Sequence, residues 1–223
     1  MSRPAKPLIT RERAARAALG VIDVQGLDSL SLELVARRIG VKAPSLYYHF
    51  KDKSELLSEV ARLLLVDVEL PEWKENAWED NVVRLLVAVR RSILRHPNAA
   101  PLLLQFFPKQ LLLPSYDRYA AEYPVPVEWK MVLIEGMEKL TFGSAFFEAS
   151  ARARSIEPMP DFDHARFPHL AAAIRANGFD DEGMFIETIR AFIAGCRVRQ
   201  QLLAVEAEAS DAGKPQRRPR ARL

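Results

Sequence analysis

The sequence predicts an all-α protein. Apolar residues recur every three or four positions along most of the chain, as they do on one face of a helix. Capping residues, glycines and prolines stand at the ends of these segments, and the apolar-polar alternation typical of strands does not occur. Of the 223 residues 49% are hydrophobic, which is enough for a sizeable core.

Four helices are expected before residue 70. The first spans residues 10–26 and begins at a threonine that can cap it, and the second spans residues 31–40 with a serine cap. Each ends at a glycine, the residue that terminates helices most readily. A short third helix covers residues 43–49, with Pro44 in its first turn, where a missing N–H group is tolerated. A fourth covers residues 54–68.

Six further helical patterns follow Pro71, which marks a boundary. They cover residues 77–96, 99–107, 111–122, 127–153, 167–177 and 180–205. Several of these segments are closed by proline or glycine, residues that stop helices.

The segment from Ser31 to Phe50 has the pattern of a helix-turn-helix, two short helices joined by a tight turn at Gly40. Val41, Leu46 and Phe50 can face inward. The outward faces are then left to Lys42, Ala43, Pro44, Ser45, Tyr47, Tyr48 and His49. Small residues suit close contact with thymine methyl groups, and hydroxyl or imidazole groups can donate to phosphates and base edges. These residues therefore predict a recognition helix.

Three side chains near this helix have a second interpretation or a separate role. Tyr47 can pack its ring between helices while its hydroxyl reaches DNA, and His49 can be a solvated surface side chain. Lys53, at the start of the next helix, places a positive charge beside exposed backbone N–H groups, an arrangement that binds phosphate.

The same residues carry a family resemblance. Ser31-Leu32, Ile39-Gly40-Val41, Pro44-Ser45-Leu46-Tyr47, His49-Phe50 and Lys53 resemble the N-terminal signature of the TetR-like family of bacterial regulators. The form APSLYYHFKDKSELL is similar to the tetracycline-repressor branch, and the later segments RRSILRHPNAAPLL and FDDEGMFIETIRAFIAGC resemble that branch more weakly. The resemblance implies nine or ten helices and a homodimer joined by a four-helix bundle of the last two long helices. It also implies double-stranded operator DNA and a small-molecule effector as partners.

The resemblance also assigns roles at the DNA. Residues 42–45 would meet base edges, Tyr47 and His49 the DNA backbone, Tyr48 the groove wall and Lys53 a phosphate. The predicted DNA-binding residues are Ser31, Glu33, Lys42, Ala43, Pro44, Ser45, Tyr47, Tyr48, His49 and Lys53. Glu33 and Ala43 depart from the branch, which has a base-reading Arg and Gln there. A carboxylate can only accept from a base donor such as the cytosine amino group, so the operator is expected to differ.

The effector site departs from the branch as well. The metal-holding histidine aligns with Leu103, so neither a metal nor another cofactor is expected. His96 precedes Pro97 at a helix end and is interpreted as a partner of the helix dipole. The predicted pocket lining is Leu103, Phe106, Phe107, Trp129, Met137, Phe142 and Phe146, with Glu135 or Glu138 as polar contacts. Such a lining suits a mostly apolar effector, weakly basic or aromatic. Plain core packing is the alternative for the aromatic stripe at Phe142, Phe146 and Phe147.

The expected organisation combines these interpretations. It comprises a flexible arm (1–9), a helix-turn-helix DNA-binding domain (10–56), a helical ligand-binding and dimerisation domain (57–207) and a disordered basic tail (208–223). The predicted function is a transcriptional repressor that an effector releases from its operator. Two recognition helices would enter successive major grooves with centres roughly 34–36 Å apart.

Other classes of function fit the sequence less well. No nucleophile triad, phosphate-binding glycine loop or zinc-protease spacing occurs, so an enzyme is not expected. A helical interaction module without DNA binding would account for the later helices but not for the first 65 residues. No apolar run reaches the ~20 residues that span a bilayer, and a cytoplasmic, nucleoid-associated protein is expected. The single cysteine, Cys196, is interpreted as a small core residue.

Overall fold

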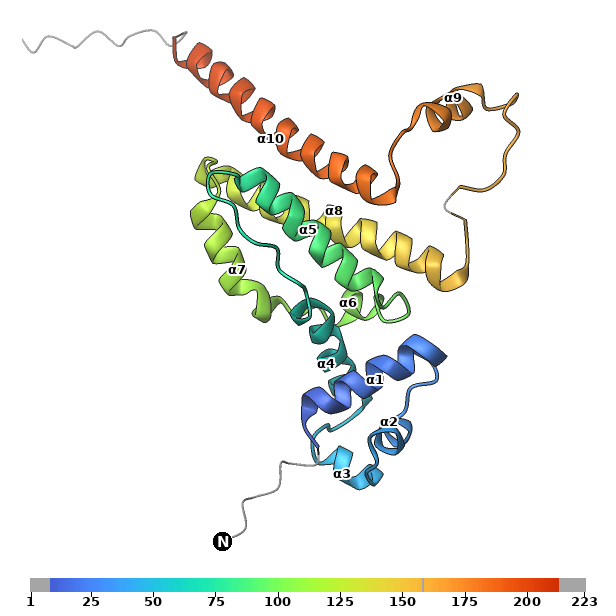
Figure 1. The fold of residues 1–223 in the computed structure, drawn as a ribbon. Helices are drawn as coiled ribbons and strands as arrows, with labels where there is room; N and C mark the ends of the chain where they lie inside the picture. The colour runs from blue at the N-terminus through green and yellow to red at the C-terminus, as the bar shows by residue number, and fades with distance from the viewer. Residues whose placement is uncertain (1–8, 158, 213–223) are drawn as a thin grey trace, which may run out of the picture.

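The computed structural model describes residues 9–157 and 159–212. These residues contain ten helices and no strand, which confirms the all-α prediction. The helices are α1 (Arg11–Gln25), α2 (Leu32–Ile39), α3 (Ala43–Tyr47), α4 (Lys53–Val66), α5 (Trp78–Leu94), α6 (Leu102–Gln105), α7 (Lys109–Glu122), α8 (Val127–Arg154), α9 (Pro168–Ala176) and α10 (Asp181–Ala212). Figure 1 shows α1–α3 at one end of the molecule, with α4 leading into a bundle of α5, α7, α8 and α10. Helix α9 lies off the side of that bundle.

Local capping explains where the first helices begin and end. The Thr10 side chain accepts a hydrogen bond from the Arg13 N–H at 3.0 Å, and the Ser31 side chain accepts one from Leu34 at 3.1 Å. Both predicted caps are therefore confirmed, and each satisfies an N–H group that the helix itself leaves unpaired. Gly40 ends α2 in the left-handed conformation, at φ +76°, which an L residue rarely adopts.

Two groups of buried apolar residues hold the helices together. The head core joins α1–α4 to the end of α5, to α6 and to part of α8, so the first helices and the bundle share one continuous interior. The bundle core lies between α5, α8 and α10 and includes Met137, Ile189 and Cys196. The burial of Cys196 agrees with its interpretation as a core residue.

Three sequence-based boundaries need correction. Ile9, placed in the flexible arm, is buried in the head core, and residues 1–8 of that arm lie outside the described residues. The last helix runs to Ala212, so residues 208–212 of the predicted tail are helical; they include alanine and glutamate, which favour helices. Residues 213–223 lie outside the described part. The segment 99–107 contains only the short α6, because residues before it form turns that bond back to the His96 carbonyl.

Helix α4 connects the two parts of the molecule. It starts at Lys53, one residue earlier than expected, because the Asp52 side chain caps it by accepting from the Glu55 N–H at 2.9 Å. The boundary predicted between residues 56 and 57 thus falls inside one continuous helix. Among the described helices none has the length and apolar composition needed to cross a membrane.

Candidate DNA-binding and effector sites

The turn between α2 and α3 is stabilised by backbone hydrogen bonds and by two buried anchors. The Val41 N–H donates to the Ala36 carbonyl at 2.9 Å, which closes the turn after Gly40. Leu46 and Phe50 are fully buried in the head core, as predicted, whereas Val41 is only half-buried. With these anchors inside, the opposite face of α3 is left at the surface.

The structure places the predicted DNA-binding residues on or beside that surface. Lys42, Pro44, Ser45, Tyr47, Tyr48 and Glu33 are exposed, and Ser31, Ala43, His49 and Lys53 are half-buried. Tyr48 is 91% exposed, an unusual position for an aromatic ring in a protein free in solution. Ala43, which was expected to face outward, packs partly against the head core.

Glu33 and Tyr47 are coupled in the protein without DNA. The Tyr47 hydroxyl donates a hydrogen bond to the Glu33 carboxylate, with 3.1 Å between the two oxygens. A backbone N–H of α2 and this hydroxyl lower the pKa of Glu33, and the carboxylate in turn raises the pKa of Tyr47. At neutral pH the exposed pair thus presents an ionised carboxylate held beside a phenol.

The N-terminus of α4 is less open to phosphate than the sequence suggests. Asp52 occupies the Glu55 N–H, and the Glu55 carboxylate accepts from the Lys51 N–H at 2.8 Å. Glu55 also accepts from the Arg11 guanidinium of α1 at 2.7 Å, and both partners lower the pKa of its carboxyl. Side-chain carboxylates therefore take two of the backbone donors near Lys53.

A partly open cavity lies in the bundle, between the end of α4 and helices α5, α7 and α8. Its volume is about 290 Å³ and its walls are mostly apolar. Leu65 and Val66 from the last turn of α4 form part of the wall, and Leu86 of α5 and Leu112 of α7 form another part. A cavity of this kind suits a small organic ligand.

The predicted lining agrees with the cavity only in part. Met137, Phe142 and the polar candidate Glu138 line it. Leu103, Phe106, Phe107, Phe146, Trp129 and Glu135 do not. Leu103 is buried in the head core, and the three phenylalanines of this group pack against the same core. Trp129 packs against the bundle core, and Glu135 is exposed and paired with Lys139 at 2.7 Å. The alternative interpretation, plain core packing, therefore holds for Phe146, whereas Phe147 is exposed.

The cavity has polar and aromatic residues that the sequence-based set omitted. Tyr116, Tyr119 and Tyr123 come from α7 and its end, and Thr141 from α8. The tyrosines are spaced by three and four residues, so they share one face of α7. That spacing could have pointed to these tyrosines as cavity residues, but only if the packing of α7 against α8 had been known.

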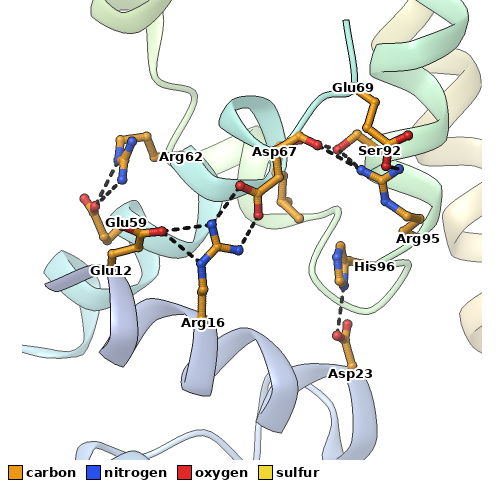
Figure 2. Close-up of polar contacts among 11 residues, drawn as sticks. Glu12, Arg16, Asp23, Glu59, Arg62, Asp67, Glu69, Ser92, Arg95 and His96 are labelled. Atoms are coloured by element: carbon orange, nitrogen blue, oxygen red, sulfur yellow. Dashed lines mark hydrogen bonds and ion pairs between the residues drawn. The ribbon is translucent and has the colours of Figure 1, made fainter. Parts of the chain in front are cut away.

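A polar network joins the reading end, which is formed by helices α1–α3, to the bundle (Figure 2). Arg16 of α1 contacts both carboxylate oxygens of Asp67 at 2.6 and 2.9 Å, and the backbone carbonyl of Asp67 accepts from Arg95 at 3.0 Å. Nδ1 of His96 lies 2.8 Å from the Asp23 carboxylate of α1. The helix-dipole interpretation of His96 is thus incomplete, because its ring has a specific partner across the two parts of the molecule.

The described part of the chain contains no group of three His, Cys, Asp or Glu residues arranged to hold a metal ion. An exposed recognition helix, a helical bundle with a cavity, and a helix that connects them define the class of helix-turn-helix regulators with a helical ligand-type domain.

Comparison with known proteins agrees with this class. Residues 15–60 match the bacterial regulatory proteins of the tetR family. A helix-turn-helix transcriptional regulator of Saccharopolyspora erythraea is 33% identical over 97 residues, 44% of this chain but only 41% of that protein. The class D tetracycline repressor of Escherichia coli is 25% identical over 198 residues, which cover 86% of this chain and 90% of the repressor.

The fold has solved counterparts. The structure of the Streptomyces coelicolor TetR family protein ActR in complex with actinorhodin superposes with a TM-score of 0.67, at 22% identity, over 86% of this chain and 98% of ActR. The chain is therefore similar to tetR-family regulators in its N-terminal part and, at lower identity, to tetracycline repressors over most of its length.

Proposed function

We propose that this protein is a homodimeric transcriptional repressor that leaves its operator when a small, mostly apolar effector enters the cavity of the bundle. Binding of the effector would shift the population toward a dimer whose two reading ends are spaced wrongly for DNA. The mode of regulation follows the family and the tetracycline repressors that resemble this chain over most of its length.

The observation that carries the proposal is the course of α4. Its first residue is a predicted phosphate contact, its middle residues are buried in the head core, and Leu65 and Val66 near its end line the cavity. A ligand that displaces the end of this helix would therefore act on a helix that packs against α1 and shares the head core with α3. The Arg16–Asp67 pair makes the coupling stiffer, because it ties the residue after α4 to α1.

Apolar side chains on the two long helices support a dimer. Phe147 of α8 is 85% exposed, and Val198, Leu202 and Val205 of α10 are also exposed in the single chain. Exposed apolar residues of this size mark an interaction surface. A second copy packing α8 and α10 against them would form the expected four-helix bundle.

A gel-shift assay with DNA from upstream of the protein's own gene tests DNA reading. The variant carrying both Tyr47→Ala and Lys53→Ala should lose binding, because it removes a predicted contact with the DNA backbone and a predicted phosphate contact. Lys74→Ala is a charge-matched control at an exposed site outside the reading end, and it should bind like the original protein. Unchanged binding by the double variant would contradict the proposal.

The dependence on salt separates this function from that of an interaction module. Each phosphate that the protein neutralises releases counterions, so affinity should fall by about 10³–10⁵ between about 50 and 200 mM salt if six to ten phosphates are contacted. An affinity for DNA that does not change with salt would favour the module without sequence-specific DNA binding.

A further inference from the structure

The polar groups of the cavity are few and lie together. Glu138 and Thr141 are three residues apart on α8, so they share one face of that helix and both line the cavity. Tyr116 of α7 lines the cavity beside Glu138. Apart from Ser115 and two further tyrosines, the rest of the lining is apolar or aromatic, so this group is the main site for a ligand's polar atoms.

The Glu138 carboxylate has a hydrogen-bond donor but no counter-charge. Its hydrogen-bond partner among the described residues is the Tyr116 hydroxyl, which donates to it. No described Lys, Arg or His forms an ion pair with it, whereas its neighbour Glu135, one turn away on the same helix, pairs with Lys139. Burial, and then the Glu138 carboxylate, raise the pKa of Tyr116, so the phenol stays protonated and continues to donate.

Thr141 provides a second open position. Its side chain is 1% exposed, and its hydroxyl has no hydrogen-bond partner within the described residues. A buried hydroxyl without a partner is costly, and a threonine in a helix usually avoids that cost by bonding to the preceding turn. A ligand with a polar atom at this point would satisfy the group.

Aromatic rings complete the surroundings. Phe142 and Tyr119 line the cavity, and Tyr119 stacks on Tyr123 with ring centroids 5.5 Å apart and planes inclined by 6°. The Arg118 guanidinium already lies 5.3 Å from the centre of the Tyr119 ring, so the contribution of these rings is packing against a flat apolar ligand.

We propose that the cavity is built for a flat aromatic cation, with a protonated nitrogen of the ligand donating to Glu138 and a second polar atom bonding to Thr141. This inference rests on the proposed function, which supplies the effector, and adds the effector's charge and shape. A carboxylate that lines a mostly apolar cavity and has no counter-ion among the described residues favours a positive ligand, because a protonated nitrogen supplies both the missing charge and a hydrogen-bond donor. An anion would be repelled by the same group.

Three ring systems of similar size and different charge test the inference. The probes are 9-aminoacridine, a cation at neutral pH, acridine, which is neutral there, and 9-anthracenecarboxylate, an anion. Their binding to the full-length protein is measured without DNA by fluorescence titration. The cation should bind about 10–100-fold more tightly than acridine, the range of a charge-assisted hydrogen bond, and the anion should bind least.

Variants locate the preference. Glu138→Gln should remove the difference between 9-aminoacridine and acridine, while Glu135→Gln, a matched change outside the cavity, should keep it. Thr141→Val, which replaces the hydroxyl with a methyl group of similar size, should weaken 9-aminoacridine binding about 2–10-fold. Circular dichroism of each variant checks that it is folded.

The outcomes decide the inference separately from the proposed function. Equal binding of the cation and the neutral probe, no binding of 9-aminoacridine, or a preference that survives Glu138→Gln would overturn the cation site. None of these results depends on DNA, whereas loss of the proposed function is read from the gel shift alone.

Discussion

The ion pair between Arg16 and Asp67 should contribute a measurable and pH-dependent part of the stability. Asp67→Asn keeps the size and shape of the side chain and removes its charge. In the original protein the guanidinium of Arg16 on α1 contacts both carboxylate oxygens at the end of α4, at 2.6 and 2.9 Å (Figure 2). The substitution therefore weakens one of the few polar ties between the reading end and the bundle.

The exposure of the two side chains limits the size of the effect. Arg16 is 49% exposed and Asp67 33% exposed, so water screens the pair. Exposed pairs contribute about 0–1 kcal/mol, and the two-pronged geometry places this one near the upper end, at about 1 kcal/mol. For a chain of this length that corresponds to a decrease of about 2–4 °C in the melting temperature.

The dependence on pH follows from the direction of the pKa shift. The hydrogen bonds from Arg16 lower the pKa of Asp67 below its ordinary value of 3.8. The stabilisation is therefore fully present above the pKa of the unfolded chain and is lost as pH falls through the lower pKa of the folded protein. The difference in unfolding free energy between the original protein and Asp67→Asn should be constant from neutral pH to about pH 5 and should shrink toward zero below 3.8.

Urea unfolding followed by circular dichroism, at one fixed protein concentration, measures this difference. Added salt of roughly 1 M should also reduce it, because the Debye length falls to about 3 Å. Glu59→Gln is the control, since its pair with Arg62 lies within α4 and joins no other helix. A difference that persists unchanged at low pH, or that is absent at neutral pH, would refute the ionic origin of the stabilisation.

Two further substitutions test local features of the fold. Ser31→Ala should destabilise the protein by about 1 kcal/mol because the Leu34 N–H loses its cap, and thermal unfolding against Ser31→Thr, which keeps a hydroxyl, checks this. Gly136→Ala should cost about 1–3 kcal/mol, since the new Cβ would lie 2.1 Å from the Phe192 ring of α10. Gly143→Ala in the same helix meets nothing within 4 Å and should be neutral or stabilising, so equal losses in the two glycine variants would contradict the packing argument.

Local signals were sufficient to predict the reading end. Thr10 and Ser31 each cap a helix by bonding to a residue three positions later, and Gly40 adopts the left-handed conformation that the turn after α2 requires. Leu46 and Phe50 are buried at the spacing that one short helix presents to a core. Each of these interactions spans a few residues, and so it is visible in the order of the amino acids.

The cavity could not be predicted in the same way. Periodicity indicates that Leu103, Phe142 and Phe146 face inward, but not which of two interiors they face. Leu103 and Phe146 contact the head core, and Phe142 contacts the head core and also lines the cavity. The missed residues Tyr116 and Thr141 meet only when α7 packs on α8.

The sequence alone therefore predicted the helical class, the helix-turn-helix and much of the exposed face of α3, since these depend on short-range capping and on periodic burial. The tertiary structure decided the rest. It placed His96 beside Asp23, closed the Arg16–Asp67 pair across 51 residues, and left Glu138 in a cavity without a counter-charge. These contacts join residues that are distant in the chain, and only the packing of the helices determines which of them meet.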